Sequence, residues 1–384
     1  MCEEYGIPYV PHPEMKTSTA AAVDVTAAEN ENDKMKRVAW TQEESEKVAP
    51  LIAEFVPTLH PGVSATDAFD AFFSSDIVKE AGLTPTEINR ATFMIERIIS
   101  GTAGPMDDLN IYYPANGLSG RLSEGYDQLI VGGYNALVEK LGDGLNIELE
   151  KVVNKIEYLK SDDGVKITCN DGSEYTADYI ICSIPLGVLK SHSVEFVPAL
   201  SEEKCGALDR LKMGGFEKVI LVFDDHFFKG WKEHLDEAST VDISGKTSKP
   251  TVVCLYDGAF AHEIQNNASL TDDDIVKEAI KYFAVGLGKD VSEIPDPIAT
   301  MCTRWHSDPY SLGSYSYFPV KAAPKDMDTL AEPVYDGRVM FCGEHTIPEH
   351  NASVHGPVIS GLREARRLDK DAHLKKVIPG LIPA

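Results

Sequence analysis

Apolar residues recur at helical spacing through residues 41–99. A capping box at Thr41–Glu44 precedes one apolar stripe, and a second capping box at Thr84–Glu87 precedes another. A further helix is expected over Ala65–Lys79. This part of the chain is therefore predicted to be helical, and nothing in it indicates a chemical role.

The pattern changes after residue 125 from helical spacing to short apolar runs. A short helix, Tyr134–Leu141, follows a glycine pair, and four strands are then predicted: Asn146–Leu149, Val153–Leu159, Val165–Cys169 and Tyr175–Ser183. Asn170-Asp171-Gly172 predicts a tight hairpin, so the strands should form a small antiparallel meander. The nearly continuous apolar run Tyr179–Ile184 is typical of a central, buried strand.

Helices and strands are mixed in the second half of the chain, which favours an α/β fold. The predicted helices are Glu202–Leu211 and Asp272–Leu287, and the predicted strands are Lys218–Phe223 and Pro250–Tyr256. Alternation over residues 313–317 predicts that Gly313, Tyr315 and Tyr317 share one strand face, which suits a flat aromatic wall.

Near the C-terminus, the short apolar strand Val339–Phe341 ends at Gly343-Glu344. A polar loop follows, and Ser353-Val354 open a helix whose free N–H groups stabilise an anion or a polarised carbonyl. These features would suit a flavin. The helix start would face the N1/C2=O edge of the flavin ring, and the Glu344 carboxylate would accept hydrogen bonds from the ribityl hydroxyls. An ordinary strand–loop–helix packing unit is the commoner explanation, and the residues alone leave both open.

Composition narrows the possible partners. The chain has 384 residues, enough for one large or two ordinary domains, and a net charge of −25. Such a charge argues against nucleic-acid binding and favours cationic ligands, although solubility alone explains it equally well.

Cysteine usage and the apolar runs bear on the compartment. The seven cysteines include no CxxC pair, which indicates a reducing compartment, and no signal peptide or membrane-length apolar run is present. We therefore expect an intracellular protein, cytoplasmic or nuclear. His345, His350 and His355 lack the HExxH spacing, so no metal site is predicted.

Three stretches of the C-terminal unit carry a family resemblance: GEHT at 343–346, ASVHG at 352–356 and SGLREA at 360–365. They resemble the flavin-binding signature of the flavin-dependent amine oxidases, in the branch that holds polyamine oxidases and lysine-specific histone demethylases. GGYNAL, KVVNKIEY and GSEYTADYIICSIPLGVLK resemble the middle of the same family. Cys342 and Pro357 depart from the family, which usually has alanine or another small residue there.

The resemblance implies an FAD site and roles for individual residues. The Val153 backbone would meet the adenine, and Pro185, where the chain leaves the cofactor domain, would also contact the cofactor. Gly343, Glu344, Ser353, Val354 and Trp305 would contact the cofactor at its flavin end, and Lys218, in GGFEKVILVF, would be catalytic by holding a water near flavin N5. Trp305 and Tyr315, in WHSDPYSLGSYS, would flank the flavin and line the substrate pocket. From the residues alone, Val153 and the aromatic residues could equally be core, and Lys218 a solvated structural lysine.

The resemblance also implies two domains. An incomplete Rossmann-like FAD-binding domain would comprise residues 125–186 and 334–370, and a mixed α/β substrate domain residues 41–124 and 187–320. Residues 1–40 would be a flexible N-terminal segment and residues 371–384 a tail. The family's N-terminal GxGxxG unit, which binds the FAD pyrophosphate, does not occur in this sequence.

The implied reaction is oxidation of a C–N bond by O₂, giving an imine or aldehyde and H₂O₂. The substrate would be a polyamine or an N-methyl-lysine-type amine. Because GxGxxG is missing, the alternative is a truncated or non-catalytic pseudo-oxidase that acts as a binding or regulatory protein. The sequence makes no prediction of oligomeric state.

Overall fold

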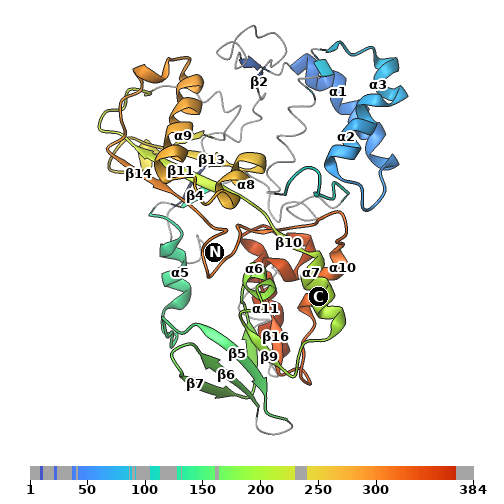
Figure 1. The fold of residues 1–384 in the computed structure, drawn as a ribbon, viewed down its shortest axis with the longest axis vertical. Coiled ribbons are helices and arrows are strands. Elements are labelled where there is room, and N and C mark those ends of the chain that lie inside the picture. The colour runs from blue at the N-terminus through green and yellow to red at the C-terminus, as the bar shows by residue number, and fades with distance from the viewer. Residues whose placement is uncertain are drawn as a thin grey trace.

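The computed structural model describes residues 9–11, 21–23, 37–39, 42–85, 87–88, 91, 104–112, 128–130, 132–160, 164–229 and 240–368. The molecule is elongated, with a helical group and one four-stranded sheet at one end and a second four-stranded sheet at the other (Figure 1). Within these ranges no helix has the length and apolar character needed to span a membrane.

The helical group contains α1 (Gln42–Phe55), the turn η2 (Val56–Thr58), α2 (Ala65–Ser74) and α3 (Asp76–Ala81). The single helix expected over Ala65–Lys79 is wrong, because Ser75 has an extended backbone and its hydroxyl caps α3 by accepting from the Val78 N–H. The second capping box is confirmed, since Thr84 and Glu87 bond each other's backbone N–H groups. Thr41 and most of the stripe after Glu87 lie outside the described residues.

The first sheet has the antiparallel order β12 (Thr240–Asp242), β13 (Thr251–Tyr256), β11 (Glu217–Val222) and β14 (Ala299–Cys302). Val219 and Leu221 of β11 pack in a core with residues of α8 (Gly258–Asn266) and α9 (Asp272–Leu287), which cover one face (Figure 1). Strand alternation therefore turns Lys218 and Ile220 toward the opposite, open face.

The second sheet has the order β7 (Glu174–Ala177), β6 (Val165–Cys169), β5 (Val153–Tyr158) and β9 (Glu195–Val197). The predicted antiparallel meander is confirmed for β5, β6 and β7, and β9 adds a parallel strand beside β5. The strand predicted at Asn146–Leu149 is wrong: this segment is an exposed loop, and Leu149 is 78% exposed. An apolar run forms a strand only where a neighbouring strand pairs with it.

Strand β8 (Ile180–Cys182) pairs in parallel with β16 (Val339–Phe341), which is fully buried as predicted. The prediction that Tyr179–Ile184 forms a central, buried strand is wrong for the described part of the chain. There β16 alone pairs with β8, and Ile181 is 37% exposed. A continuous apolar run indicates burial on both faces, whereas in the described part of the chain β8 is left partly exposed at Ile181.

Helices α6 (Leu186–Lys190), α7 (Glu202–Arg210) and α10 (Pro324–Ala331) share a core, and α11 (His355–Leu368) follows β16. Helix α5 (Asn135–Gly142) precedes β5. The remaining elements are short: β1 (Tyr9–Pro11) with β4 (Gln128–Ile130), β2 (Ala21–Val23) with β3 (Arg37–Ala39), β10 (Lys212–Met213) with β15 (Ser316–Tyr317), and the turns η3 (Ser244–Lys246), η4 (Val291–Glu293), η5 (Glu344–Thr346) and η6 (Pro348–His350). Of the segment predicted to be flexible, 1–40, only β1, β2 and β3 are described, and the tail 371–384 lies outside the described residues.

A buried lysine joins α7, α10 and β16. Lys204 is 3% exposed, and its ammonium group donates to the carbonyls of Thr329, Leu330 and Glu332 at the end of α10. Its Nζ lies 4.2 Å from the ring centroid of Phe341. Burial lowers the pKa of Lys204 to about 8. The lysine thus donates to carbonyls at the C-terminal end of α10, of which Thr329 also accepts from the Glu332 N–H at 3.4 Å.

We predict that Lys204→Met lowers the free energy of unfolding by about 2 kcal/mol, because buried carbonyls lose a charged donor while a desolvation cost is removed. Urea denaturation measures the change. Lys325→Met, at a side chain of α10 that is 82% exposed, is the matched control and should change the value by less than about 0.5 kcal/mol. Equal stability of the Lys204 variant and the parent would contradict the structural role of this lysine.

Candidate cofactor and amine site

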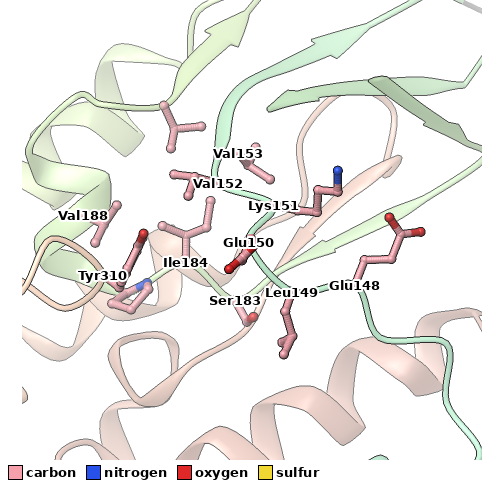
Figure 2. Close-up of a pocket in the computed structure, with 12 residues that line it drawn as sticks. Glu148, Leu149, Glu150, Lys151, Val152, Val153, Ser183, Ile184, Val188 and Tyr310 are labelled. Carbon is pink, nitrogen blue, oxygen red and sulfur yellow. The ribbon is translucent and has the colours of Figure 1, made fainter. Parts of the chain in front are cut away.

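A cavity of about 530 Å³ lies where the loop before β5 meets the end of β8. It brings together two residues that the sequence predicted as cofactor contacts, Val153 and Pro185. The other residues that line it are Glu148, Leu149, Glu150, Lys151, Val152, Ser183, Ile184, Val188, Val194 and Tyr310. Tyr310 and Val188 stand at one side of this cavity, with Lys151 and Glu148 at the opposite side (Figure 2). Ligands of parallel sheets bind beyond the carboxyl ends of the strands, which is where this cavity lies relative to β8.

Tyr310 was not among the site residues predicted from the sequence. Its loop packs directly on α6, since a Cβ at Gly187 would lie 2.4 Å from the Leu312 carbonyl oxygen. Asp308 fixes this loop: its carboxylate accepts from the Tyr310 N–H at 2.8 Å, and its carbonyl accepts from the Leu312 N–H at 2.9 Å. The aromatic residues of this segment were the one sequence signal that could have indicated Tyr310. The packing of its loop on α6 could not be predicted, because α6 is far away in the sequence.

Gly343 and Glu344 stand at the end of β16. Gly343 has a φ of 135°, and a Cβ there would lie 2.5 Å from Cε1 of His345, so only glycine fits. The Glu344 carboxylate accepts from the N–H of Ser316 at 3.2 Å, the hydroxyl of Ser316 at 2.6 Å and the N–H of Ala352 at 2.9 Å. Burial raises the pKa of Glu344. This carboxylate therefore ties β15 to the loop that leads into α11.

The N-terminus of α11 is built to present N–H groups. The Ser353 hydroxyl donates to the His350 carbonyl at 2.6 Å and accepts from the Gly356 N–H at 3.2 Å. Among the described residues, no hydrogen-bond acceptor is found for the backbone N–H groups of Val354 and His355. A helix start of this kind receives a partial negative charge well, as predicted from the sequence.

Lys218 lies on the open face of β11, and Trp305 and Tyr315 lie in the segment that follows β14. The Lys218 side chain is exposed, and its backbone N–H donates to Oγ1 of Thr303 at 2.7 Å. Trp305 is 40% exposed, and the Tyr315 ring lies 5.9 Å from that of Phe216. Burial raises the pKa of the Tyr315 phenol, so it stays neutral.

The wall predicted from Gly313, Tyr315 and Tyr317 is wrong at Tyr317. That ring is 2% exposed, and its hydroxyl donates to Asp108 at 2.9 Å. Gly313 has a φ of 136° and the strand β15 begins only at Ser316, so strict alternation does not extend over the segment.

The described residues fit the two ends of FAD. The cavity at Val153 and Pro185 offers an apolar slot, and the free N–H groups of α11 offer donors to a flavin. The pyrophosphate turn, GxGxxG, is not in the sequence. No group of three or more His, Cys, Asp or Glu in the described part of the chain is placed to hold a metal ion.

Both the sequence and the fold of this chain match a known protein family. The family model of the flavin containing amine oxidoreductases matches residues 103–369. The chain belongs to this family. Its fold is the α/β flavin amine oxidase fold predicted from the sequence. It matches a putrescine oxidase double mutant with a TM-score of 0.72 at 16% identity, over 96% of this chain and 84% of that one.

Curated relatives give a second comparison. The chain is 35% identical over 292 residues to lysine-specific histone demethylase 1 homolog 3 of Oryza sativa subsp. japonica, covering 69% of this chain and 35% of that protein. It is 32% identical over 297 residues to Protein FLOWERING LOCUS D of Arabidopsis thaliana, covering 70% of this chain and 36% of that protein. The chain thus spans about a third of the length of the curated relatives that it matches.

The ring of His345, which lies against Gly343, makes the folding stability depend on pH in the acid range. Burial, followed by the charges of Lys204 and Arg363, lowers the pKa of His345 from 6.5 to about 4. Between these two pH values the unfolded chain binds a proton that the folded chain excludes. Folding stability is therefore complete above pH 6.5 and is lost as the pH falls toward 4.

We predict that His345→Phe flattens the fall in unfolding free energy between pH 6.5 and 4 by up to ~3 kcal/mol. Urea titrations across this pH range test it. His60→Gln, at an exposed histidine, controls for the loss of a histidine as such. A variant with the full acid dependence of the parent would contradict the assignment to His345.

Proposed function

We propose that the protein is an FAD-dependent amine oxidase that oxidises a C–N bond of a polyamine or an N-methyl-lysine-type amine. The observation that carries this proposal is the cavity beyond β8, whose lining includes Val153 and Pro185, both expected to contact FAD. The family match over residues 103–369 supports it.

In this proposal Val153 and Pro185 hold the adenine end of FAD, and Gly343, Glu344, Ser353, Val354 and Trp305 hold the flavin end. The cofactor supplies the redox chemistry, as an electron-pair acceptor that O₂ reoxidises with formation of H₂O₂. The amine becomes an imine, which water hydrolyses to an aldehyde. The chain's own task is to bind, orient and shield the reacting amine.

Lys218 would hold a water and move a proton at its ammonium group. The Lys218 side chain reaches solvent from the open face of β11. In the described part of the chain no acidic side chain forms an ion pair with it. Trp305 and Tyr315 would exclude bulk water and orient the amine, which must be neutral at nitrogen to lose electrons. The net charge of −25 would raise the local concentration of cationic amines.

The substrate class rests on different grounds. Several curated relatives bear the name lysine-specific histone demethylase 1 homolog, and one matched structure is described as putrescine oxidase bound to putrescine. The sequence shows no long charged insert of the kind that binds a partner as a coiled coil, which favours a small amine. H₂O₂ release with spermidine, putrescine and an N-methyl-lysine peptide distinguishes these substrates.

A non-catalytic pseudo-oxidase is the second candidate function. Two observations favour it: GxGxxG is absent from the sequence, and β8 has an exposed Ile181 on its open side. Such a protein would keep the fold as a binding or regulatory module. An intracellular location, cytoplasmic or nuclear, stays a prediction under either function.

The flavin absorbance of the purified chain separates the two candidates. We predict that the 384-residue chain retains little FAD after gel filtration, because the pyrophosphate turn is missing. Joining a glycine-rich strand–turn–helix ahead of it should restore retention. A stoichiometric yellow cofactor in the chain as printed would show the first expectation to be wrong, and a colourless extended chain would favour the pseudo-oxidase.

Glu344→Ala should weaken flavin affinity in the extended, FAD-competent chain. The loss of a charge-assisted hydrogen bond is worth ~1.5–3 kcal/mol, about ten- to a hundredfold in Kd. Quenching of flavin fluorescence measures Kd. Ser316→Ala is the control, because it removes one bond to Glu344 but leaves the carboxylate in place. The role of Glu344 is contradicted by an unchanged Kd in a folded Glu344 variant.

Lys218→Met in the same extended chain should keep the flavin spectrum and the melting temperature, since the side chain is exposed. Amine turnover should fall by ~10²-fold or more, the scale for losing a proton-transfer group. Lys277→Met, at an exposed lysine of α9, should leave turnover unchanged. A lower melting temperature with intact turnover per folded molecule would identify Lys218 as structural instead.

A further inference from the structure

Glu217 is a buried carboxylate that is not among the predicted cofactor or substrate residues. It directly precedes Lys218 in β11 and points to the opposite face, where its side chain is 0% exposed. In the described ranges no lysine, arginine or histidine forms an ion pair with it. A carboxylate buried without a cation is costly unless hydrogen bonds satisfy it, so its donors indicate its purpose.

Those donors come from the residues around the predicted amine site. Oε1 of Glu217 accepts from the backbone N–H of Trp305 at 3.0 Å, and Oε2 accepts from the hydroxyl of Thr303 at 2.6 Å. The same Thr303 hydroxyl oxygen accepts from the Lys218 N–H at 2.7 Å. One carboxylate therefore joins the backbone of Trp305 to the backbone of Lys218.

Trp305 is held on its other side as well. Its carbonyl accepts from the Gly313 N–H at 3.0 Å, two residues before Tyr315. Glu217 and Gly313 thus fix both polar groups of the Trp305 peptide backbone, although the indole remains 40% exposed.

Helix α8 completes the arrangement through Gln265. Its Nε2 donates to Oε1 of Glu217 at 3.5 Å, and a Cβ at Gly215 would lie 2.6 Å from that nitrogen. Because Gly215 has no side chain, the amide group of Gln265 can lie close to the backbone at 215 and reach the Glu217 carboxylate.

We propose that Glu217 is a positioning residue that sets the indole of Trp305 relative to Lys218. It acts through the backbone of Trp305 and Thr303 and does not touch substrate or cofactor. Its consequence for turnover rests on the proposed amine oxidase function, whereas its effect on Trp305 does not.

The test follows Trp305 itself. In a background with Trp40→Phe and Trp231→Phe, Trp305 is the sole tryptophan, and its emission can be measured without FAD. Glu217→Leu should shift the emission to the red. It should also raise the acrylamide quenching constant up to roughly 2.5-fold, the ratio of full exposure to the present 40%.

Glu217→Gln is the conservative variant. Its amide oxygen can accept from the Trp305 N–H while its NH₂ group donates to Thr303, so emission and quenching should return to parental values. Asp326→Ala is the matched control, because Asp326 is another buried carboxylate, 6% exposed, that binds Arg210 in a different core. It should lower stability and leave the Trp305 signal unchanged.

Three results would overturn the proposal: an unchanged signal in Glu217→Leu, an equal shift in Glu217→Gln, or the same shift in Asp326→Ala. If Glu217→Leu does not fold, Glu217→Asp replaces it. Its shorter side chain cannot reach both donors, so a red shift supports the proposal and a parental signal contradicts it.

Activity gives a separate readout in the FAD-competent chain. Glu217→Leu should raise the KM for amine and lower kcat, with Glu217→Gln restoring both. A fluorescence shift without any amine oxidation in the parent would uphold the positioning of Trp305 and reject the proposed function instead.

Discussion

The contacts of Ser316 hold the predicted substrate and cofactor segments together. Its N–H and hydroxyl donate to the Glu344 carboxylate, and its carbonyl accepts from Nδ2 of Asn351 at 3.4 Å. Ser316 is 0% exposed, so these bonds form away from competing water. They fix β15, which follows Tyr315, against the loop that leads to the N-terminus of α11. The placement of Tyr315 relative to the N-terminus of α11 depends on the Glu344 carboxylate.

Local sequence patterns predicted the elements that carry this contact. Strand β16 and helix α11 lie where the sequence predicted a short apolar strand and a helix that begins near Ser353. Patterns failed where the outcome depends on a distant partner. The segment Asn146–Leu149 has apolar residues but no strand beside it, and the buried ring of Tyr317 bonds Asp108, more than two hundred residues away. Glu217 and Tyr310 were missed for the same reason, since their partners are remote in sequence.

The two faces of β11 divide the work of the site. The face toward α8 and α9 is a packed apolar core that contains Glu217 at its edge, and the open face presents Lys218. Neighbouring residues on this strand therefore point to opposite faces: Glu217, the proposed positioning residue for Trp305, is buried, and Lys218 is exposed to solvent. The loop before β5, which lines the cavity beyond β8, exposes the side chains of Leu145, Ile147 and Leu149.

The central claim is that these residues serve the oxidation of an amine. Anaerobic mixing of the FAD-loaded, extended chain with spermidine, putrescine or an N-methyl-lysine peptide tests it most directly. We predict that one of these amines bleaches the flavin absorbance and that O₂ restores it with one H₂O₂ per flavin. A flavin spectrum unchanged by every amine, in a protein that holds FAD stoichiometrically, would contradict it.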